Sequence, residues 1–167
     1  MLHSFAPIEP PHPEILILGT MPSVRSLLEQ QYYGHPQNRF WPLLFALWDH
    51  PAPAEYEKRT AFLREKGIAL WDVLASCERE GSLDAAIREP VPTQVEELLS
   101  RYPGIHTIFL NGQKAGAFYR RLIEPKLARR VESIVLPSSS PARAMPFEKK
   151  LAAWRIVRER LEAEEKQ

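Results

Sequence analysis

Residues 31–41, QYYGHPQNRFW, hold the densest group of side chains that could take part in chemistry. The rings of Tyr32 and Tyr33 can stack on a planar ligand, and the carboxamide oxygen of Asn38 can hold a water molecule without a shifted pKa. Each has a structural alternative, because the rings could pack within the loop and Asn38 could cap a helix that begins at Phe40. The residues alone leave both interpretations open.

Three more loops carry polar residues where strands are expected to end: residues 19–23 (GTMPS), 111–113 (NGQ) and 137–141 (PSSSP). The carboxyl ends of parallel strands share one edge of a sheet, so these loops are expected to meet there. Each leads into a segment with helical character, and the free N–H groups of a helix start can bind anions such as phosphate. No loop has the motif of a nucleotide triphosphatase, a dinucleotide site or a serine hydrolase. These three classes are therefore excluded.

Metal and thiol chemistry find little support. The five histidines lack metal-ligand spacing, and Cys77 is the only cysteine, so an internal disulfide and a four-thiolate zinc site are excluded. We expect no metal and no cofactor. Asp72, at the end of an expected strand, is interpreted as a turn or cap residue, and Asn111 either satisfies a turn or reads the edge of a ligand.

The strands and helices that must position these loops alternate along the chain. Continuous apolar runs such as ILILG predict strands covered on both faces. The expected strands are 14–19, 68–74, 107–111 and 131–136. The expected helices are 24–30 with Ser23 as N-cap, 40–48, 55–66, 93–99, 113–123 and a last helix with Leu151, Trp154, Val157 and Leu161 on its core face. This order predicts a three-layer α/β/α sandwich with a central, mainly parallel four-stranded sheet, in a single domain over residues 1–167.

Composition is that of a globular protein: 167 residues, 44% hydrophobic, 26% charged and a net charge of +1. The sequence has no apolar run of roughly 18 residues, which predicts no membrane span, and the lone thiol predicts a cytoplasmic location. The basic residues are concentrated in two parts of the chain. Residues 120–130 hold five basic residues and one acid, and Arg143, Lys149 and Lys150 follow the serine-rich loop. Such clusters can contact phosphates or form solvated helix faces.

Taken in order, GTMPS at 19–23, HPQNRFW at 35–41 and LPSSSPA at 136–142 resemble the uracil-DNA glycosylase superfamily. The likeness is greatest to its hypoxanthine-DNA glycosylase branch (family six), a relative of the mismatch-specific uracil/thymine glycosylases. It extends from about residue 14 to the last helix and includes GIALWDVL at 67–74.

The resemblance implies a role for each loop. The first loop, with Gly19, Thr20 and Met21, would surround an extruded base. Tyr33 would stack on that base, and Asn38 would be catalytic, because the first loop lacks the Asn or Asp of other branches. Asn111 either satisfies a turn or contacts the edge of the base. DNA contacts are expected at Ser23, Pro137, Ser138, Ser139, Ser140 and Arg143. Serines stand where the mismatch enzymes carry a bulky residue that intercalates into DNA.

The implied activity is hydrolysis of the N-glycosidic bond of a deaminated base after base flipping. Hypoxanthine is the expected base, with uracil as a second substrate, and no strand-cleaving lyase activity is expected. The expected partner is double-stranded DNA with deaminated bases, or single-stranded DNA, bound by a monomer. The alternative is a non-catalytic DNA-binding or interaction module on the same fold.

Overall fold

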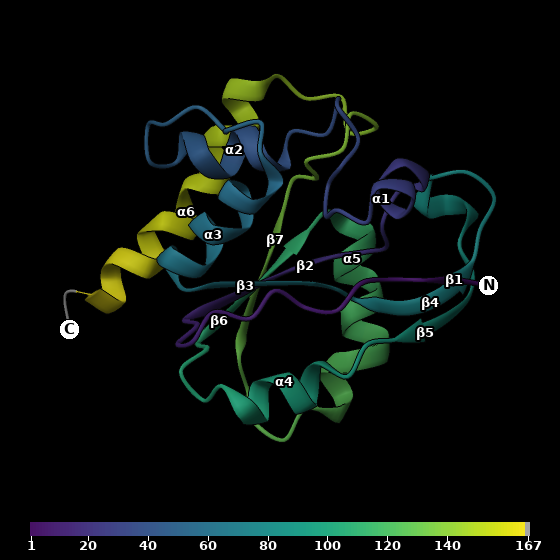
Figure 1. Ribbon diagram of the computed structural model, residues 1–167. Coiled ribbons are helices and arrows are strands. Elements are labelled where there is room, and N and C mark those ends of the chain that lie inside the picture. The colour runs from purple at the N-terminus through teal and green to yellow at the C-terminus, as the bar shows by residue number, and fades with distance from the viewer. Residues whose placement is uncertain (166–167) are drawn as a thin grey trace.

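A computed structural model describes residues 1–165 (Figure 1). Its strands are β1 (Leu2–His3), β2 (Ile15–Gly19), β3 (Ile68–Asp72), β4 (Leu74–Glu78), β5 (Arg88–Pro92), β6 (Thr107–Asn111) and β7 (Glu132–Leu136). Its α-helices are α1 (Val24–Glu29), α2 (Phe40–Ala46), α3 (Tyr56–Lys66), α4 (Val95–Arg101), α5 (Gln113–Phe118) and α6 (Phe147–Glu165). Three short helical segments are η1 (Asp84–Ala86), η2 (Tyr119–Ile123) and η3 (Glu124–Lys126). None of the described helices is both long enough and apolar enough to cross a membrane.

The central sheet has four strands in the order β3-β2-β6-β7, and every neighbouring pair is parallel. This confirms the predicted parallel sheet flanked by helices. The register pairs Gly19 with Asp72 and Asn111 with Leu136. The ends of all four strands therefore lie along one edge of the sheet, where the polar loops begin.

Alternate residues of β2 pack against different helix layers, because successive side chains of a strand point to opposite faces. Ile15 and Ile17 belong to the core formed with α2, α3 and α6, whereas Leu16 and Leu18 belong to the core formed with α4 and α5. Figure 1 shows these two groups of helices on opposite sides of the sheet. Trp154 of α6 is fully buried. This packing on both faces fixes the strand ends that carry the site.

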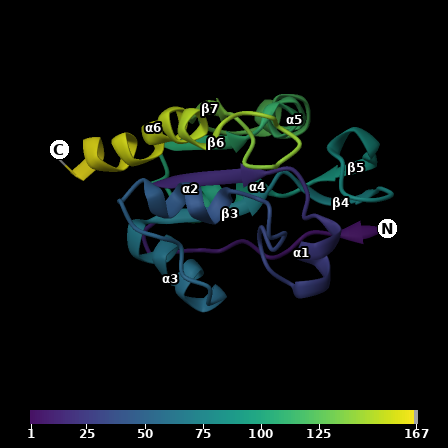
Figure 2. The same cartoon turned by 90° about the horizontal axis from the view of Figure 1, so that it is seen from above.

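A second, antiparallel sheet, β1-β4-β5, was not expected from the sequence. The prediction of one strand over 68–74 was wrong, because the chain leaves the central sheet at Val73. The Val73 N–H donates to Gly19 O (2.7 Å), and its carbonyl accepts from Thr93 N (2.8 Å), so Leu74 begins β4 in the other sheet. The apolar pattern continues through this break. In Figure 2 the second sheet projects beside α1.

The predicted helix over 113–123 also differs from the structure. α5 ends at Phe118 and continues as the π-helical turn η2, followed by η3, in which Pro125 has no N–H to continue a helix. Further along, Arg129 donates to the carbonyls of Ile105 (2.8 Å) and Tyr102 (3.2 Å). It precedes β7, at the end of the sheet opposite the polar loops. The cluster at 120–130 therefore does not extend the surface formed by those loops.

Candidate active site

A cleft of about 860 Å³ lies over the carboxyl ends of the central strands. Every residue that the sequence singled out as catalytic, base-binding or DNA-binding lines it. They are Gly19, Thr20, Met21, Ser23, Tyr33, Asn38, Asn111, Pro137, Ser138, Ser139, Ser140 and Arg143. The fold thus brings together side chains from four separate stretches of sequence.

Gly19 is the point on which two polar side chains converge. A Cβ atom at Gly19 would lie 2.5 Å from the Tyr33 hydroxyl and 2.6 Å from Asp72 Oδ1. Neither approach is compatible with a side chain at that position, so the close approach requires glycine. The Tyr33 hydroxyl and Asp72 Oδ1 therefore both lie close against Gly19 at the end of β2.

Tyr33 is held in one orientation by three constraints. Its backbone has a φ of 55°, a conformation uncommon for a residue with a side chain. Its ring stacks on Phe40, with centroids 4.1 Å apart and planes 9° from parallel, and its hydroxyl accepts from Asn111 Nδ2 at 3.1 Å. Burial, followed by the Asp72 charge, raises the pKa of the hydroxyl well above its usual value. Phe40 therefore covers one face of the Tyr33 ring.

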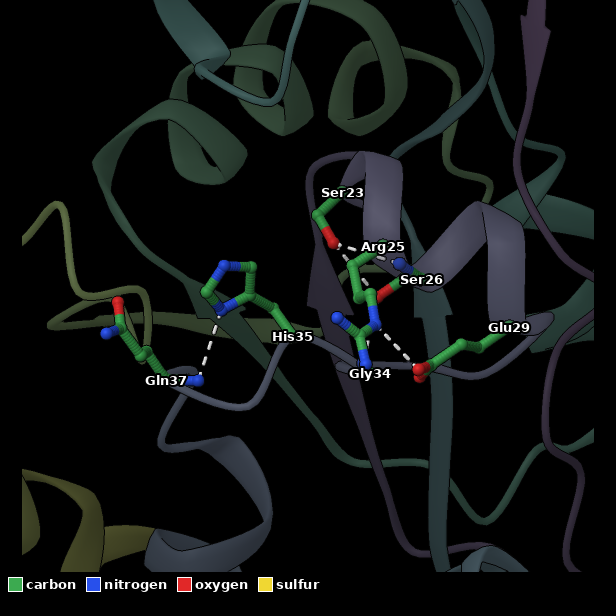
Figure 3. A network of polar contacts seen from close by, with 7 residues as sticks. All are labelled: Ser23, Arg25, Ser26, Glu29, Gly34, His35 and Gln37. Carbon is green, nitrogen blue, oxygen red and sulfur yellow. Dashed lines mark hydrogen bonds and ion pairs between the residues drawn. The ribbon is translucent and has the colours of Figure 1, made fainter.

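Side-chain contacts tie the loop that carries Tyr33 to α1 (Figure 3). Ser23 Oγ accepts from Ser26 N (3.1 Å), which confirms Ser23 as the N-cap of α1. Ser26 Oγ in turn accepts from Gly34 N (2.8 Å), and His35 Nδ1 accepts from Gln37 N (3.1 Å). The loop is therefore braced on the protein before any ligand binds.

Asn38, Ser139 and Asn111 form a closed hydrogen-bond network beneath the serine-rich loop. The oxygen of Asn38 accepts from Phe40 N (2.9 Å) and from Ser139 Oγ (2.8 Å). Ser139 is fully buried, and it accepts from Asn111 Nδ2 (2.9 Å) while its own N–H donates to Asn111 Oδ1 (2.9 Å). A backbone N–H can only donate, so the contact to Phe40 fixes which end of the Asn38 amide is the oxygen.

Asp72 also lines the cleft. The sequence-based interpretation of Asp72 as a turn or cap residue missed this position. Its side chain is buried, and its Oδ2 has no hydrogen-bond partner within the described residues. Burial, with a further contribution from the nearby Asp84, raises the pKa of Asp72 to about 7, whereas Arg79 opposes the shift. An acid without a partner at the floor of a cleft is a functional-site candidate. Its position near the end of an expected strand was the available signal.

The family model of the uracil DNA glycosylase superfamily matches residues 6–162. The chain belongs to this superfamily. Two relatives, each named hypoxanthine DNA glycosylase, are similar to it over most of their length. The protein from Methanosarcina acetivorans is 38% identical over 146 residues, which cover 86% of this chain and 89% of the relative. The protein from Methanosarcina barkeri is 34% identical over 152 residues, or 90% and 93% of the two chains.

A solved structure gives the same result for the fold. It is the solution NMR structure of a Methanosarcina acetivorans protein described provisionally as a uracil DNA glycosylase. It matches with a TM-score of 0.82 and 35% identity, covering 96% of this chain and 98% of the other. The expected enzyme class, a DNA glycosylase of this superfamily, is confirmed, which disfavours the non-catalytic alternative.

The rim of this glycosylase's cleft carries both acidic and basic side chains. Asp84 and Lys114 face the cleft from η1 and α5, and Arg143 lies beyond the serine-rich loop. Lys150 is buried and donates to Ser140 O (3.0 Å); burial, with Arg143 and Arg39 nearby, lowers the pKa of its ammonium group. This buried lysine braces the serine-rich loop. Within the described residues, no three His, Cys, Asp or Glu side chains gather as metal ligands.

Three of the expected roles in the glycosylase do not fit this geometry. Asn111 has a contact at the base edge as one of its two alternatives, but its amide nitrogen already donates to Tyr33 and Ser139 and its oxygen accepts from Ser139 N. Ser139 was expected to contact DNA, but its side chain has no exposed surface and is fully engaged in the network. The oxygen of Asn38 was expected to hold the attacking water, but it already accepts two hydrogen bonds. The cap role of Asn38, one of its two alternatives, is thus present. Its Nδ2 amide group is the end that is not engaged by these two contacts.

Proposed function

We propose that the chain removes hypoxanthine from deoxyinosine in DNA by hydrolysing the N-glycosidic bond of a nucleotide turned out into the cleft. The convergence of Tyr33, Asn38 and Asp72 on one cleft carries this proposal. The two relatives named hypoxanthine DNA glycosylase support it. A base in a duplex is inaccessible, so a cleft at the protein surface requires that the nucleotide leave the stack.

Asp72 is the group suited to hold the departing base. A protonated carboxyl has one donor and one acceptor, which complement the adjacent C6=O and N1–H of hypoxanthine. As the bond breaks, negative charge grows on the base, and an O–H donor directed at O6 stabilises it. The raised pKa of Asp72, about 7, keeps this proton available near neutral pH. Uracil has the same pair of groups at C4=O and N3–H, which supports it as a second substrate.

Asn38 is the group suited to place the attacking water. Because its oxygen is engaged by Phe40 and Ser139, the Nδ2 amide donates to the water and leaves a lone pair for attack. The water oxygen bonds to C1′, the electron pair of the bond from C1′ to the base stays with the base, and the released proton passes to solvent. An amide cannot act as a strong base, so the reaction depends mainly on stabilising the leaving group.

The DNA strand is expected to follow the rim of the cleft. Ser138 and Ser140 are half-buried and Arg143 is exposed, so their polar groups can meet phosphates beside the extruded nucleotide. Double-stranded DNA has phosphates on both sides of the damaged base. We expect the protein to act as a monomer on it.

The test is a single-turnover assay on a duplex with one deoxyinosine, in buffer with a chelator. Strand cleavage after alkali at the inosine position, and no cleavage without alkali, is the expected result. Parallel duplexes with uracil or xanthine rank the bases. If no abasic product forms from any of these duplexes, the proposed function is wrong.

A further inference from the structure

Two carboxyl groups lie against adjacent residues of the first loop of the site. Asp72 Oδ1 is so close to Gly19 that a Cβ atom there would lie 2.6 Å from it. The Asp84 carboxylate accepts a hydrogen bond from the hydroxyl of Thr20, the next residue. Both acids line the cleft. A carboxylate repels the phosphates of DNA, so the presence of a second acid in this cleft requires a functional explanation.

The segment that carries Asp84 is fixed to the first loop and to α1. Arg79 is almost completely buried, and its guanidinium donates to Pro22 O in the first loop (2.6 Å). Ser82 Oγ accepts from Val24 N at the start of α1 (2.9 Å). Figure 1 shows this segment beside α1. The protein therefore sets the position of Asp84 in the cleft before DNA binds.

The two acids have unequal surroundings. Burial raises the pKa of both carboxyl groups. For Asp84, the Thr20 hydroxyl and the charges of Arg79 and Lys114 oppose this shift. For Asp72, the charge of Asp84 adds to the shift and Arg79 opposes it, while Oδ2 has no hydrogen-bond partner among the described residues. Of two neighbouring carboxyl groups, the one with more contacts that stabilise its charge ionises first. The negative charge therefore belongs on Asp84 and the proton on Asp72.

Two tyrosine side chains also interact with Asp72. They are Tyr32 and Tyr33, and burial, followed by the Asp72 charge, raises the pKa of both hydroxyls well above the usual value. Both hydroxyls are therefore neutral near pH 7 and add no charge to the site. The negative charge that acts on Asp72 is that of Asp84.

We infer that Asp84 is a positioning residue whose negative charge keeps the proton on Asp72. This inference rests on the proposed function, in which protonated Asp72 donates to the departing base. Loss of the Asp72 proton would place two like charges close together, which makes that loss less favourable. Asp84 does not touch the reacting atoms. It extends to higher pH the range in which Asp72 can donate.

The test compares Asp84→Asn with Glu80→Gln, a matched control at an exposed acid of the same segment that does not line the cleft. The amide oxygen in Asp84→Asn can still accept from Thr20, so the substitution removes the charge and keeps the bond. Single-turnover rates on the deoxyinosine duplex are measured at saturating enzyme from pH 5 to pH 9. Asp84→Asn is expected to match wild type at pH 5 and to be about three- to tenfold slower at pH 8, because Asp72 then loses its proton at lower pH. Glu80→Gln is expected to match wild type throughout.

Side-chain 13C NMR of the protein without DNA follows the same proton directly, and Asp72→Asn identifies the Asp72 signal. The Asp72 carboxyl is expected to titrate near pH 7 in wild type and at lower pH in Asp84→Asn. An unchanged Asp72 titration in Asp84→Asn would overturn the inference. A loss of rate of equal size at every pH would also overturn it, because Asp84 would then act on the substrate. Absence of product from wild type would instead contradict the proposed function, and the NMR titration would still decide whether Asp84 holds the proton on Asp72.

Discussion

The two sides of the cleft differ in how completely their polar groups are paired. Around Ser139, the oxygen of Asn38 and both ends of the Asn111 amide are hydrogen-bonded within the protein. Beside Gly19, the buried Asp72 keeps Oδ2 without a partner in the described structure. A paired network fixes geometry, whereas an unpaired buried group costs stability unless a ligand satisfies it. We therefore regard the first side as the scaffold and the second as the part that binds the base.

The largest effect is expected from Asn38, which joins the scaffold to the chemistry. Asn38→Ala should slow single-turnover excision by about 100-fold or more, a typical loss for one positioned catalytic group. Binding to inosine-containing DNA should change little, because phosphate contacts dominate affinity. Quench-flow rates and a fluorescence anisotropy titration measure the two quantities.

Asn38→Asp separates the two roles of this residue. Its carboxylate can still accept from Phe40 N and Ser139 Oγ, so the melting temperature should stay near that of wild type. It has no N–H to hold the water, so excision should remain slow. A fast Asn38→Asp protein would contradict the role of Nδ2, and a fast, folded Asn38→Ala protein would reduce Asn38 to a helix cap.

Tyr33 should show the next largest effect, since it lies between the two sides. Tyr33→Ala should weaken engagement of the extruded base by about 1–3 kcal/mol, the usual scale for a base–aromatic stack. Tyr33→Phe keeps the stack on Phe40 and loses only the hydrogen bond from Asn111, so its effect should be mild. Single-turnover rates measured over a range of enzyme concentrations give the effect of each of the two substitutions. Equal behaviour of wild type and Tyr33→Ala would assign the ring to loop packing alone.

Ser139→Ala tests the scaffold itself. It removes the hydroxyl that links Asn38 to Asn111 and should lower the free energy of unfolding by about 1–2 kcal/mol, the cost of leaving buried polar groups unpaired. Ser138→Ala is the matched control, because that hydroxyl accepts only a local bond from Ser140 N (3.1 Å). Urea denaturation measures both variants. Equal midpoints would show that the network adds nothing to stability.

Asp72 should give a pH-dependent effect on stability. Its folded-state pKa is raised to about 7, so the folded protein holds a proton that the unfolded chain has lost. Stability from this group is full below about pH 4 and is lost as pH rises through 7. Asp72→Asn carries no ionisable group at this position, so its melting temperature relative to that of wild type should be several degrees higher at pH 8 than at pH 4. A constant difference between the two proteins at all pH values would contradict the raised pKa.

Much of this fold could be predicted from local sequence, because each strand of the parallel sheet is a short apolar run ended by a polar loop. The break at Val73 could not, since it depends on bonds to Gly19 and Thr93, which lie far away in the sequence. The residues of three cleft loops were found because they lie at or just after strand ends, whereas Tyr33 and Asn38, between α1 and α2, were found from the density of aromatic and polar residues in their loop. Asp72 is itself the last residue of β3, but its lack of a partner is a property of the packed interior, and the sequence shows no sign of it.

The pH dependence of excision by wild type and Asp72→Asn tests most directly whether the unpaired side of the cleft binds the base. Single-turnover rates on the deoxyinosine duplex, from pH 5 to pH 9, report the chemical step. The excision rate of wild type should be nearly constant below about pH 6. Above the pKa of Asp72, about 7, the rate should fall about tenfold per pH unit as Asp72 loses its proton. Asp72→Asn, whose amide donates at every pH, should show a flat profile. Parallel profiles for the two proteins would contradict the assignment of Asp72 to the departing base.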